Sequence, residues 1–256
     1  MDSSPPASFS SLPPELVSKI CSDPGLDKKD LIVLRLTSKA QGIHASATRA
    51  FGRHCFSRVP LLYTEYSLET FLKICRHPVF RSCIRLVELS CFRFDPGHFN
   101  LLVESMTIWN LDWDELVRNV QLLSARCDAQ ESLEPWDAKT LLERAFARFA
   151  ESGHSLTIAV STDEYNALGV SRVFEPEPET NYFHADVPFA LHLLLASAKR
   201  AGCRVPKLDI TVASRLFSSQ DYDCDLSDLM HSNTELSLEM CFITDFDEDE
   251  HAESIR

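Results

Sequence analysis

Three aspartates at alternate positions form the pattern in this sequence that comes closest to a metal site. Asp221, Asp223 and Asp225 match the start of a calcium-binding loop, where carboxylates at alternate positions supply the first ligands. Such a loop needs a glycine next and a glutamate at its end, but this chain has Leu226 and Ser232 there. We therefore interpret the segment as an acidic surface turn, and we expect no metal ion or other cofactor.

The cysteines and histidines also lack the spacing of a catalytic or metal site. The chain has nine of each, but it contains no C-x-x-C pair and no zinc-binding signature. It also lacks the G-x-S-x-G nucleophile turn, the Walker phosphate loop and the G-x-G-x-x-G dinucleotide pattern. We therefore expect no enzymatic activity and assign no catalytic residue.

The surroundings of the cysteines indicate a reducing compartment. Most of them lie singly within apolar runs, where a free cysteine behaves as a small buried hydrophobic residue. Residues 1–8 are polar and contain prolines, unlike a signal peptide. The longest apolar run, residues 189–198, contains His192 and is too short to cross a bilayer. The sequence thus predicts a cytoplasmic or nuclear protein without a membrane attachment.

Two short helices joined by a Pro-Gly turn are predicted over residues 11–39. Pro13 suits the first turn of a helix, where its missing N–H group has no intrahelical partner to lose. Pro24 and Gly25 end that helix, and Asp27 is the predicted N-cap of the next one. These helices carry more apolar residues than they can bury against each other. One face must therefore pack on the rest of the chain or on a partner.

The same stretch resembles the F-box in the order and spacing of four pieces. These are Leu12-Pro13-Pro14-Glu15-Leu16, Ile20, Leu26-Asp27-Lys28-Lys29-Asp30-Leu31 and Leu34-Arg35-Leu36-Thr37-Ser38-Lys39. The resemblance covers residues 9 to 49, and the wider stretch to residue 94 is similar to fungal F-box-like proteins. Gln41 departs from the family, which often places a tryptophan or another large aromatic residue there.

The resemblance implies a substrate receptor of a Skp-cullin-F-box ubiquitin ligase. A three-helix F-box module would bind a Skp-type adaptor, and through it a cullin, while the rest of the chain presents an unknown target protein for ubiquitination. Apolar side chains would form the contact, with Glu15 and Lys39 at its polar rim. Carried over by motif position, the adaptor-binding residues are Leu12, Pro13, Glu15, Leu16, Ile20, Leu31, Leu34 and Lys39.

The charge of the chain is acidic overall but unevenly distributed. The formal net charge is −13, which opposes general nucleic-acid binding because that function needs a basic surface. Residues 1–60 nevertheless lean basic, and the last forty residues are strongly acidic. The basic lean suits an acidic adaptor, whose encounter with the chain it would accelerate.

Beyond the first module, helices alternate with short apolar strands. The predicted helices span residues 67–75, 136–152, 187–201 and 226–231, and the strands that follow them span residues 83–94, 155–161, 207–212 and 236–243. A third helix of the first module is predicted near residues 39–49, and Cys55-Phe56 and residues 59–63 are β-prone. Alternation of this kind predicts an α/β (α+β) fold with parallel strands and an irregular, leucine-rich-repeat-like arrangement.

The predicted organisation has four parts. They are a disordered leader (1–8), the F-box module (9–57), a helix-strand recognition domain (58–244) and an acidic tail (245–256). The loop at residues 173–186 and the acidic tail are predicted target contacts.

Two alternatives to the receptor remain open. One is an F-box scaffold that binds the adaptor without a ligase role. The other is a helix-turn-helix DNA-binding regulator over residues 31–51, and its possible DNA contacts are Lys39, His44, Thr48, Arg49 and Arg53.

Overall fold

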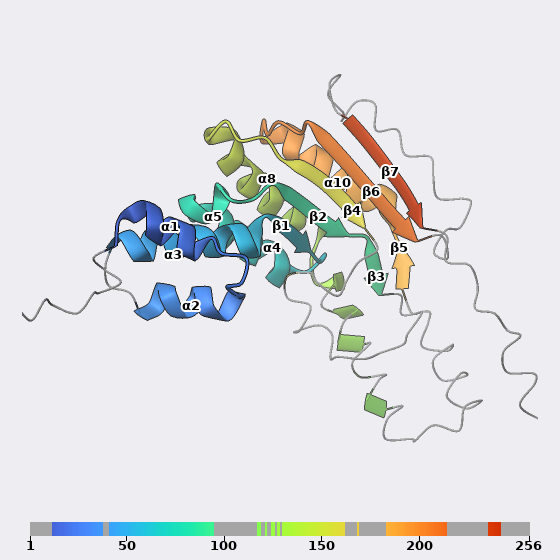
Figure 1. Ribbon diagram of the computed structural model, residues 1–256. Helices are drawn as coiled ribbons and strands as arrows, with labels where there is room; N and C mark the ends of the chain where they lie inside the picture. The colour runs from blue at the N-terminus through green and yellow to red at the C-terminus, as the bar shows by residue number, and fades with distance from the viewer. Residues whose placement is uncertain are drawn as a thin grey trace, which may run out of the picture.

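The computed structural model describes residues 12–37, 41–94, 117–118, 121, 124–125, 127–128, 130–161, 168, 183–213 and 235–241 (Figure 1). Its longer helices are α1 (Pro14–Cys21), α2 (Lys28–Thr37), α3 (Gln41–Phe56), α4 (Glu65–Arg76), α8 (Pro135–Glu151) and α10 (Val187–Arg200), with a short α5 (Pro78–Arg81). Its strands are β1 (Arg58–Leu61), β2 (Leu86–Ser90), β3 (Phe92–Phe94), β4 (Thr157–Ser161), β5 (Phe183–Ala185), β6 (Lys207–Ala213) and β7 (Glu235–Cys241). The predicted leader (1–8), acidic tail (245–256) and helix 226–231 lie outside the described residues.

Five of these strands form a parallel sheet in the order β1-β2-β4-β6-β7, and β3 pairs with β5 in a separate antiparallel ribbon. The strand order of the larger sheet follows the order of the chain. Since crossovers between parallel strands are right-handed, connections that always advance in one direction place their helices on the same face. The predicted α/β class, with parallel strands and intervening helices, is confirmed.

The helix-covered face of the sheet is apolar. Paired positions across the strands form a row at Val59, Val87, Ile158 and Leu208, followed one pleat later by Leu61, Leu89, Val160 and Ile210. These side chains share one buried core with the inner faces of α4, α8 and α10. Alternate residues of a strand point to opposite faces, so the apolar rows fix which side of the sheet the helices cover.

The opposite face of the sheet is largely polar. Its central row consists of Pro60, Glu88, Ala159, Asp209 and Ser237. The buried carboxylate of Glu88 accepts two hydrogen bonds from the Arg58 guanidinium, one of them 2.8 Å long. Lys207 Nζ lies 2.8 Å from Asp209 Oδ1 on the same face. One face of the sheet is therefore apolar and the other largely polar, because apolar and polar residues alternate along the strands.

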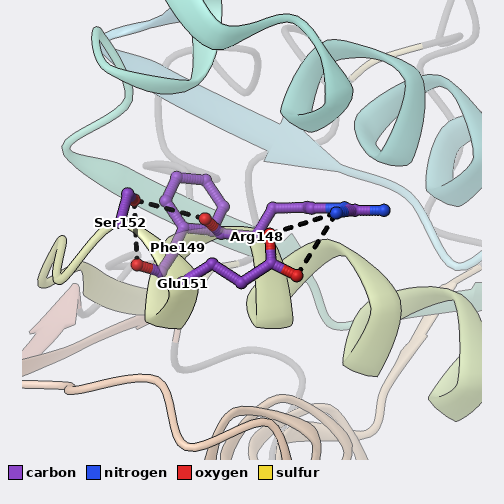
Figure 2. A network of polar contacts seen from close by, with 4 residues as sticks. All are labelled: Arg148, Phe149, Glu151 and Ser152. Atoms are coloured by element: carbon purple, nitrogen blue, oxygen red, sulfur yellow. Dashed lines mark hydrogen bonds and ion pairs between the residues drawn. The ribbon is translucent and has the colours of Figure 1, made fainter.

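The end of α8 shows how local sequence terminates a helix (Figure 2). Ser152 Oγ lies 2.9 Å from the carbonyl oxygen of Phe149 and 3.2 Å from that of Arg148, two groups near the helix end. Arg148 Nη1 donates to both carboxylate oxygens of Glu151, at 3.0 and 3.2 Å. Gly153 follows with φ of 64°, a left-handed conformation that glycine adopts without a Cβ clash. These contacts and Gly153 explain why the helix predicted over residues 136–152 ends where it does.

Other boundaries differ from the sequence-based expectations. Cys55 and Phe56, predicted to be β-prone, form the last turn of α3. Residues 183–185 lay within a predicted loop but form strand β5. Helix α4 begins at Glu65 because the side chain of Thr64 caps it, accepting a hydrogen bond from the Ser67 N–H at 3.3 Å. In the described part of the chain, no helix is long and apolar enough to cross a membrane.

Candidate partner-binding surface

The first three helices form a small module with an apolar core of its own. Helices α1 and α2 both pack on α3. The buried residues of this module core are Val17, Cys21, Leu31, Ile43, Ala47, Ala50 and Phe51. Figure 1 shows the module at one end of the molecule, beside α5 and β1. The apolar residues that this core does not take up are the candidates for a partner contact.

A reciprocal cap fixes the start of α2. The Asp30 N–H donates to Asp27 Oδ1 at 2.8 Å, and the Asp27 N–H donates to Asp30 Oδ2 at 3.1 Å. Each carboxylate thus satisfies an N–H group that the helix leaves without an intrahelical acceptor. The hydrogen bond from the Asp30 backbone holds the pKa of the Asp27 carboxyl below its ordinary value. The N-cap predicted at Asp27 is therefore present.

Four of the predicted adaptor-binding residues lie exposed on or next to α1. Pro13 precedes the helix as its N-cap, and Glu15 lies exposed in its first turn. Leu16 and Ile20 expose 48% and 39% of their surfaces. Their side chains lie one turn apart on the same side of the helix, because residues four positions apart share a helix face. Together they form a short exposed apolar strip. We call Leu16 and Ile20 the α1 strip.

The other predicted adaptor-binding residues do not lie on that surface. Leu31 is a core residue, only 3% exposed, and Leu12 and Leu34 are half-buried against the same core. Lys39 lies outside the described residues. Leu31, Leu34 and Leu12 therefore support the module from within. Of the predicted leucine and isoleucine residues, only Leu16 and Ile20 on α1 are exposed.

Two exposed apolar residues on α2 were not among the predicted site residues. Val33 is exposed, and Leu36 has 79% of its surface in contact with solvent. The apolar run of α2 indicated a surplus of hydrophobic residues, but it did not show which of them face outward. Once Leu31 is placed in the core, helical spacing turns Val33 and Leu36 away from it.

An arginine links the module to the rest of the protein. The Arg35 guanidinium carbon lies 4.4 Å from the centre of the Phe51 ring and 5.3 Å from that of Phe80. Phe51 belongs to α3 of the module, whereas Phe80 belongs to α5. Arg35 Nε is buried, and within the described ranges it has no hydrogen-bond partner. The side chain is therefore held by aromatic stacking, and no sequence motif pointed to this role.

Aromatic rings complete the junction between the module and the sheet. The Phe56 ring lies 5.7 Å from Phe51 and 5.0 Å from Phe80, and His77 stacks on Phe80 at 4.1 Å. Phe56 packs against both the module core and the core of the sheet region. Rings at these separations attract one another beyond simple area burial. The cluster thus joins α3 to α5 through side-chain contacts.

The residues considered for DNA contact fall into different environments. His44, Arg49 and Arg53 lie exposed on α3, but Thr48 is buried in the module. Lys39 lies outside the described residues. Thr48 therefore does not belong to the exposed surface of α3.

The described residues contain no group of three or more His, Cys, Asp or Glu side chains arranged to hold a metal ion. Seven of the described cysteines are thiols that form no disulfide bond. Burial raises the pKa of Cys203 to about 11 and raises that of Cys75 further, which disfavours the nucleophilic thiolate at both. The aspartates at 221, 223 and 225 lie outside the described residues.

Comparisons with known proteins add little to this geometry. No family model matches the chain, and no curated protein matches it. Among solved structures, the crystal structure of a methylornithine synthase matches with 14% sequence identity, covering 89% of this chain and 68% of that chain, with a TM-score of 0.18. A similarity this low carries no argument about fold or function.

Proposed function

We propose that this chain is a non-catalytic substrate receptor of the F-box type. In this proposal α1–α3 bind a Skp-type adaptor, and through it a cullin, while the sheet region holds a target protein for ubiquitination. The F-box-like pattern of residues 12–39 motivates the proposal. The observation that carries it is the α1 strip, because Leu16 and Ile20 remain exposed although the module core beneath α1 is already filled.

The α1 strip is suited to anchor a protein partner. Binding interfaces draw most of their affinity from a few large apolar side chains that become desolvated, rather than from the total area. Leu16 and Ile20 belong to the same helix, whose adjoining face holds Val17 and Cys21 in the core. A partner that covers the strip would remove apolar surface from water without reorganising the module.

The exposed basic residues of the module support an acidic adaptor. Lys19, Lys28, Lys29 and Arg53 are exposed on the three helices of the module. Exposed charges of this kind contribute mainly to the rate of encounter with an oppositely charged partner. An acidic Skp-type adaptor therefore fits the module better than it fits the acidic remainder of the chain.

The sheet region supports the other half of the proposal. Its strands follow one another in chain order, with the described helices on one face, as in an irregular leucine-rich-repeat-like array. Such arrays present the face without helices to a binding partner, and here that face carries Glu88, Asp209 and other polar groups. This arrangement supports a recognition role for residues 58–244 without naming the target.

Co-purification with a Skp-type adaptor tests the adaptor half of the proposal. We expect a stable complex with the full chain, and its loss in Leu16→Asp, since a charge would then be buried at the anchor. Tyr66→Asp is the matched control, because it places the same charge at an exposed site of α4. Retention of the complex by Leu16→Asp, or equal loss in Tyr66→Asp, would contradict the assignment.

A second assay separates a receptor from an adaptor-binding scaffold. A protein captured by the chain is added to the reconstituted ligase with its ubiquitin-charged partner. Ubiquitination that depends on Leu16 supports the receptor. Adaptor binding without any modification of captured proteins supports the scaffold instead.

A further inference from the structure

The edge of the sheet at β7 is accessible to a further strand. In the order β1-β2-β4-β6-β7, β7 is the last strand, and each of its residues pairs with β6 (Figure 1). Among the described residues, no other strand of this sheet lies on the far side of β7. Glu235 is exposed, and Leu236 has 55% of its surface in solvent. A partner could therefore reach the start of β7.

Successive residues of a strand in this sheet direct their backbone groups to opposite neighbours. The alternation is visible at the start of β4. The Leu156 N–H donates to the carbonyl oxygen of Arg204, on the side of β6, at 3.1 Å. The next N–H, that of Thr157, donates to the carbonyl oxygen of Arg85, on the side of β2, at 2.9 Å. In a central strand both sets of groups thus find a partner.

The same alternation applied to β7 leaves one set of backbone groups facing outward. The Glu235 N–H donates to the carbonyl oxygen of Pro206 at 2.8 Å, so Glu235 faces β6. Leu236 comes next, and its N–H and carbonyl groups therefore point away from β6. Outward backbone groups on an edge strand are a template to which an extended segment can add.

The opposite edge of the sheet is protected against such an addition. Strand β1 (Arg58–Leu61) is short and contains Pro60, which has no N–H group to offer. The Leu168 N–H also donates to the Pro60 carbonyl oxygen at 2.7 Å, so part of that edge is already paired. Strand β7 is longer and contains neither proline nor lysine, the residues that commonly block edge pairing. Of the two edges, β7 is the one suited to bind a strand.

The two faces of the sheet give this edge a different chemistry on each side. Leu236 is paired with Leu208 and so continues the apolar row of the helix-covered face. Glu235 is paired with Lys207 and lies on the opposite, polar face. An added strand would therefore place alternate side chains beside an exposed leucine and an exposed glutamate.

The charge of the last two strands is negative. Strand β7 contains two glutamates and no basic residue, and β6 contains one lysine and one aspartate. That lysine, Lys207, is already engaged, since its Nζ lies 2.8 Å from Asp209 Oδ1. Contact with Asp209 and the charge of Glu235 raise the pKa of Lys207 above its ordinary value. Arg204 precedes β6, and its carbonyl group faces β4. Within the two strands, carboxylates thus remain in excess, which favours a basic partner.

The same charge disfavours an occupant from this protein itself. A second copy would bring another β7 with the same glutamates, and each chain has a formal net charge of −13. The longer stretches outside the described residues each contain more acidic than basic residues. They are 1–11, 95–116, 162–167, 169–182, 214–234 and 242–256. A segment of another protein is the better match.

We propose that β7 binds an extended segment of the target protein in which basic and apolar residues alternate. The segment adds a strand to the sheet, with basic side chains beside Glu235 and apolar ones beside Leu236. This inference rests on the proposed receptor function for its word "target", and it deepens that function by naming the chemistry of the segment. The bound segment borders the polar face that the proposed function assigns to the target.

Titration of the full chain with a labelled peptide tests the proposal. The probe is a short synthetic peptide that alternates lysine and valine, and its binding is followed by fluorescence anisotropy. We expect saturable binding. Leu236→Pro should weaken it about tenfold or more, because the ring replaces an N–H that bonds the peptide but not β6. Leu236→Thr is the matched control, since threonine keeps that N–H and suits a strand, and it should change little.

A charge reversal tests the preference for basic residues. Glu235→Lys should weaken binding of the peptide about threefold or more, and added salt should reduce the difference from the parent chain. Glu65→Lys is the matched control, because Glu65 is an exposed glutamate on α4. Equal effects of the two reversals would show attraction to an acidic protein in general and would overturn the proposal.

Two N-methylated peptides test strand addition without altering the protein. One is methylated at its lysine nitrogens in the backbone and the other at its valine nitrogens, so each loses the N–H groups of one edge. A peptide added to β7 uses only one edge. We expect one methylated peptide to lose binding and the other to keep it. Equal binding by both would overturn the proposal, even if Leu236→Pro failed to fold.

Other outcomes would also overturn it. These are absence of saturable binding by the folded parent chain and equal binding by folded Leu236→Pro and Leu236→Thr. Binding that appears only after residues 242–256 are removed, or only when a dimer is diluted apart, would show that this protein supplies the occupant itself.

The adaptor assay keeps this test separate from the proposed function. Leu16→Asp should leave peptide binding unchanged, because Leu16 belongs to α1, whereas β7 is at the other end of the strand order from the module. Peptide binding by a chain that captures no adaptor would leave the edge site established and remove the ligase role. Adaptor capture without peptide binding would remove the edge site and leave the proposed function.

Discussion

Leu16 and Leu31 are both leucines of the F-box-like pattern, but Leu16 is exposed and Leu31 is buried. Leu31 is enclosed by the module core, so its removal would unfold the surface that a partner recognises. Leu16 is 48% exposed, and its replacement should spare the fold. The sequence motif could name both positions but could not separate contact from support. That distinction depends on which side of each helix α3 covers.

The reciprocal cap at Asp27 leads to a pH-dependent prediction. Asp27→Ala should lower the thermal midpoint, because the Asp30 N–H loses its acceptor. The folded pKa of Asp27 lies below its unfolded value. The ionised Asp27 carboxylate therefore stabilises the folded protein fully above the ordinary aspartate pKa of about 3.9. This stabilisation is lost as the pH falls through the lower pKa of the folded state.

Asp27→Asn is the matched control for this cap. Asparagine keeps an oxygen acceptor at the N-cap. The thermal midpoint of Asp27→Asn should therefore be close to that of the parent chain at neutral pH and should change less on acidification. Thermal unfolding at a series of pH values measures all three proteins. If the thermal midpoints of the parent and Asp27→Asn moved further apart on acidification, the account would be contradicted.

Cysteine reactivity tests burial at single residues. Cys75 and Cys203 are buried with raised pKa values, whereas Cys55 is only half-buried. Among these three cysteines, a thiol reagent near neutral pH should modify Cys55 first and should reach Cys75 and Cys203 only on unfolding. Mass spectrometry after timed labelling measures the order in which the cysteines react, and labelling in denaturant is the control. Early labelling of Cys75 in the folded protein would show that the core around α4 is misplaced.

The elements were predictable where apolar spacing and stop signals agreed. Helix α10 and strand β6 follow the expected pattern closely, because Gly202 lies between them with φ of 68°. The end of α3 was not predicted, since Cys55 and Phe56 have local preferences for strands. Tertiary contacts between Phe56 and Phe80 favour the helix there instead. Neither ring is near the other in sequence, so spacing alone gave no signal.

The same reasoning applies to the candidate sites. The pattern of residues 12–39 located the first two helices of the module and included Leu16 and Ile20, because both depend on local spacing, but it did not show that these two are exposed. The contact between α8 and α10 was not foreseen. They meet only because the parallel order β2-β4-β6 brings these two helices side by side. Contacts set by topology cannot be read from either helix alone.

Two glycines of α3 provide a matched test of the junction. A Cβ on Gly52 would lie 2.9 Å from Cys83 Sγ and 3.3 Å from a ring carbon of Phe80, whereas a Cβ on Gly42 would meet nothing within 4 Å. Gly52→Ala should therefore destabilise the protein by about 1–3 kcal/mol, as overpacking does. Gly42→Ala should be neutral or stabilise by up to about 1 kcal/mol, because alanine favours helix. Urea unfolding compares them, and equal midpoints would contradict the close approach of α3 to α5.

At the scale of the whole molecule, the proposed surfaces occupy different parts of one chain. The α1 strip belongs to the module, which lies beside β1, whereas α8 and α10 belong to the sheet region and precede β4 and β6 (Figure 1). The aromatic junction of Phe51, Phe56 and Phe80 connects the module to the sheet region. A receptor must hold its adaptor and its target together without letting them compete for one site. Separate surfaces joined by packed side chains meet that requirement.

The most direct test of this account is a calorimetric titration of the full chain with a Skp-type adaptor. The account predicts saturable one-to-one binding with a negative heat-capacity change, which marks burial of apolar surface. Ile20→Asp should weaken binding about tenfold or more, and Lys73→Glu should not, since Lys73 lies outside the module. Absence of binding by the folded parent chain, or full binding by Ile20→Asp, would contradict the claim that the α1 strip is an adaptor-docking surface.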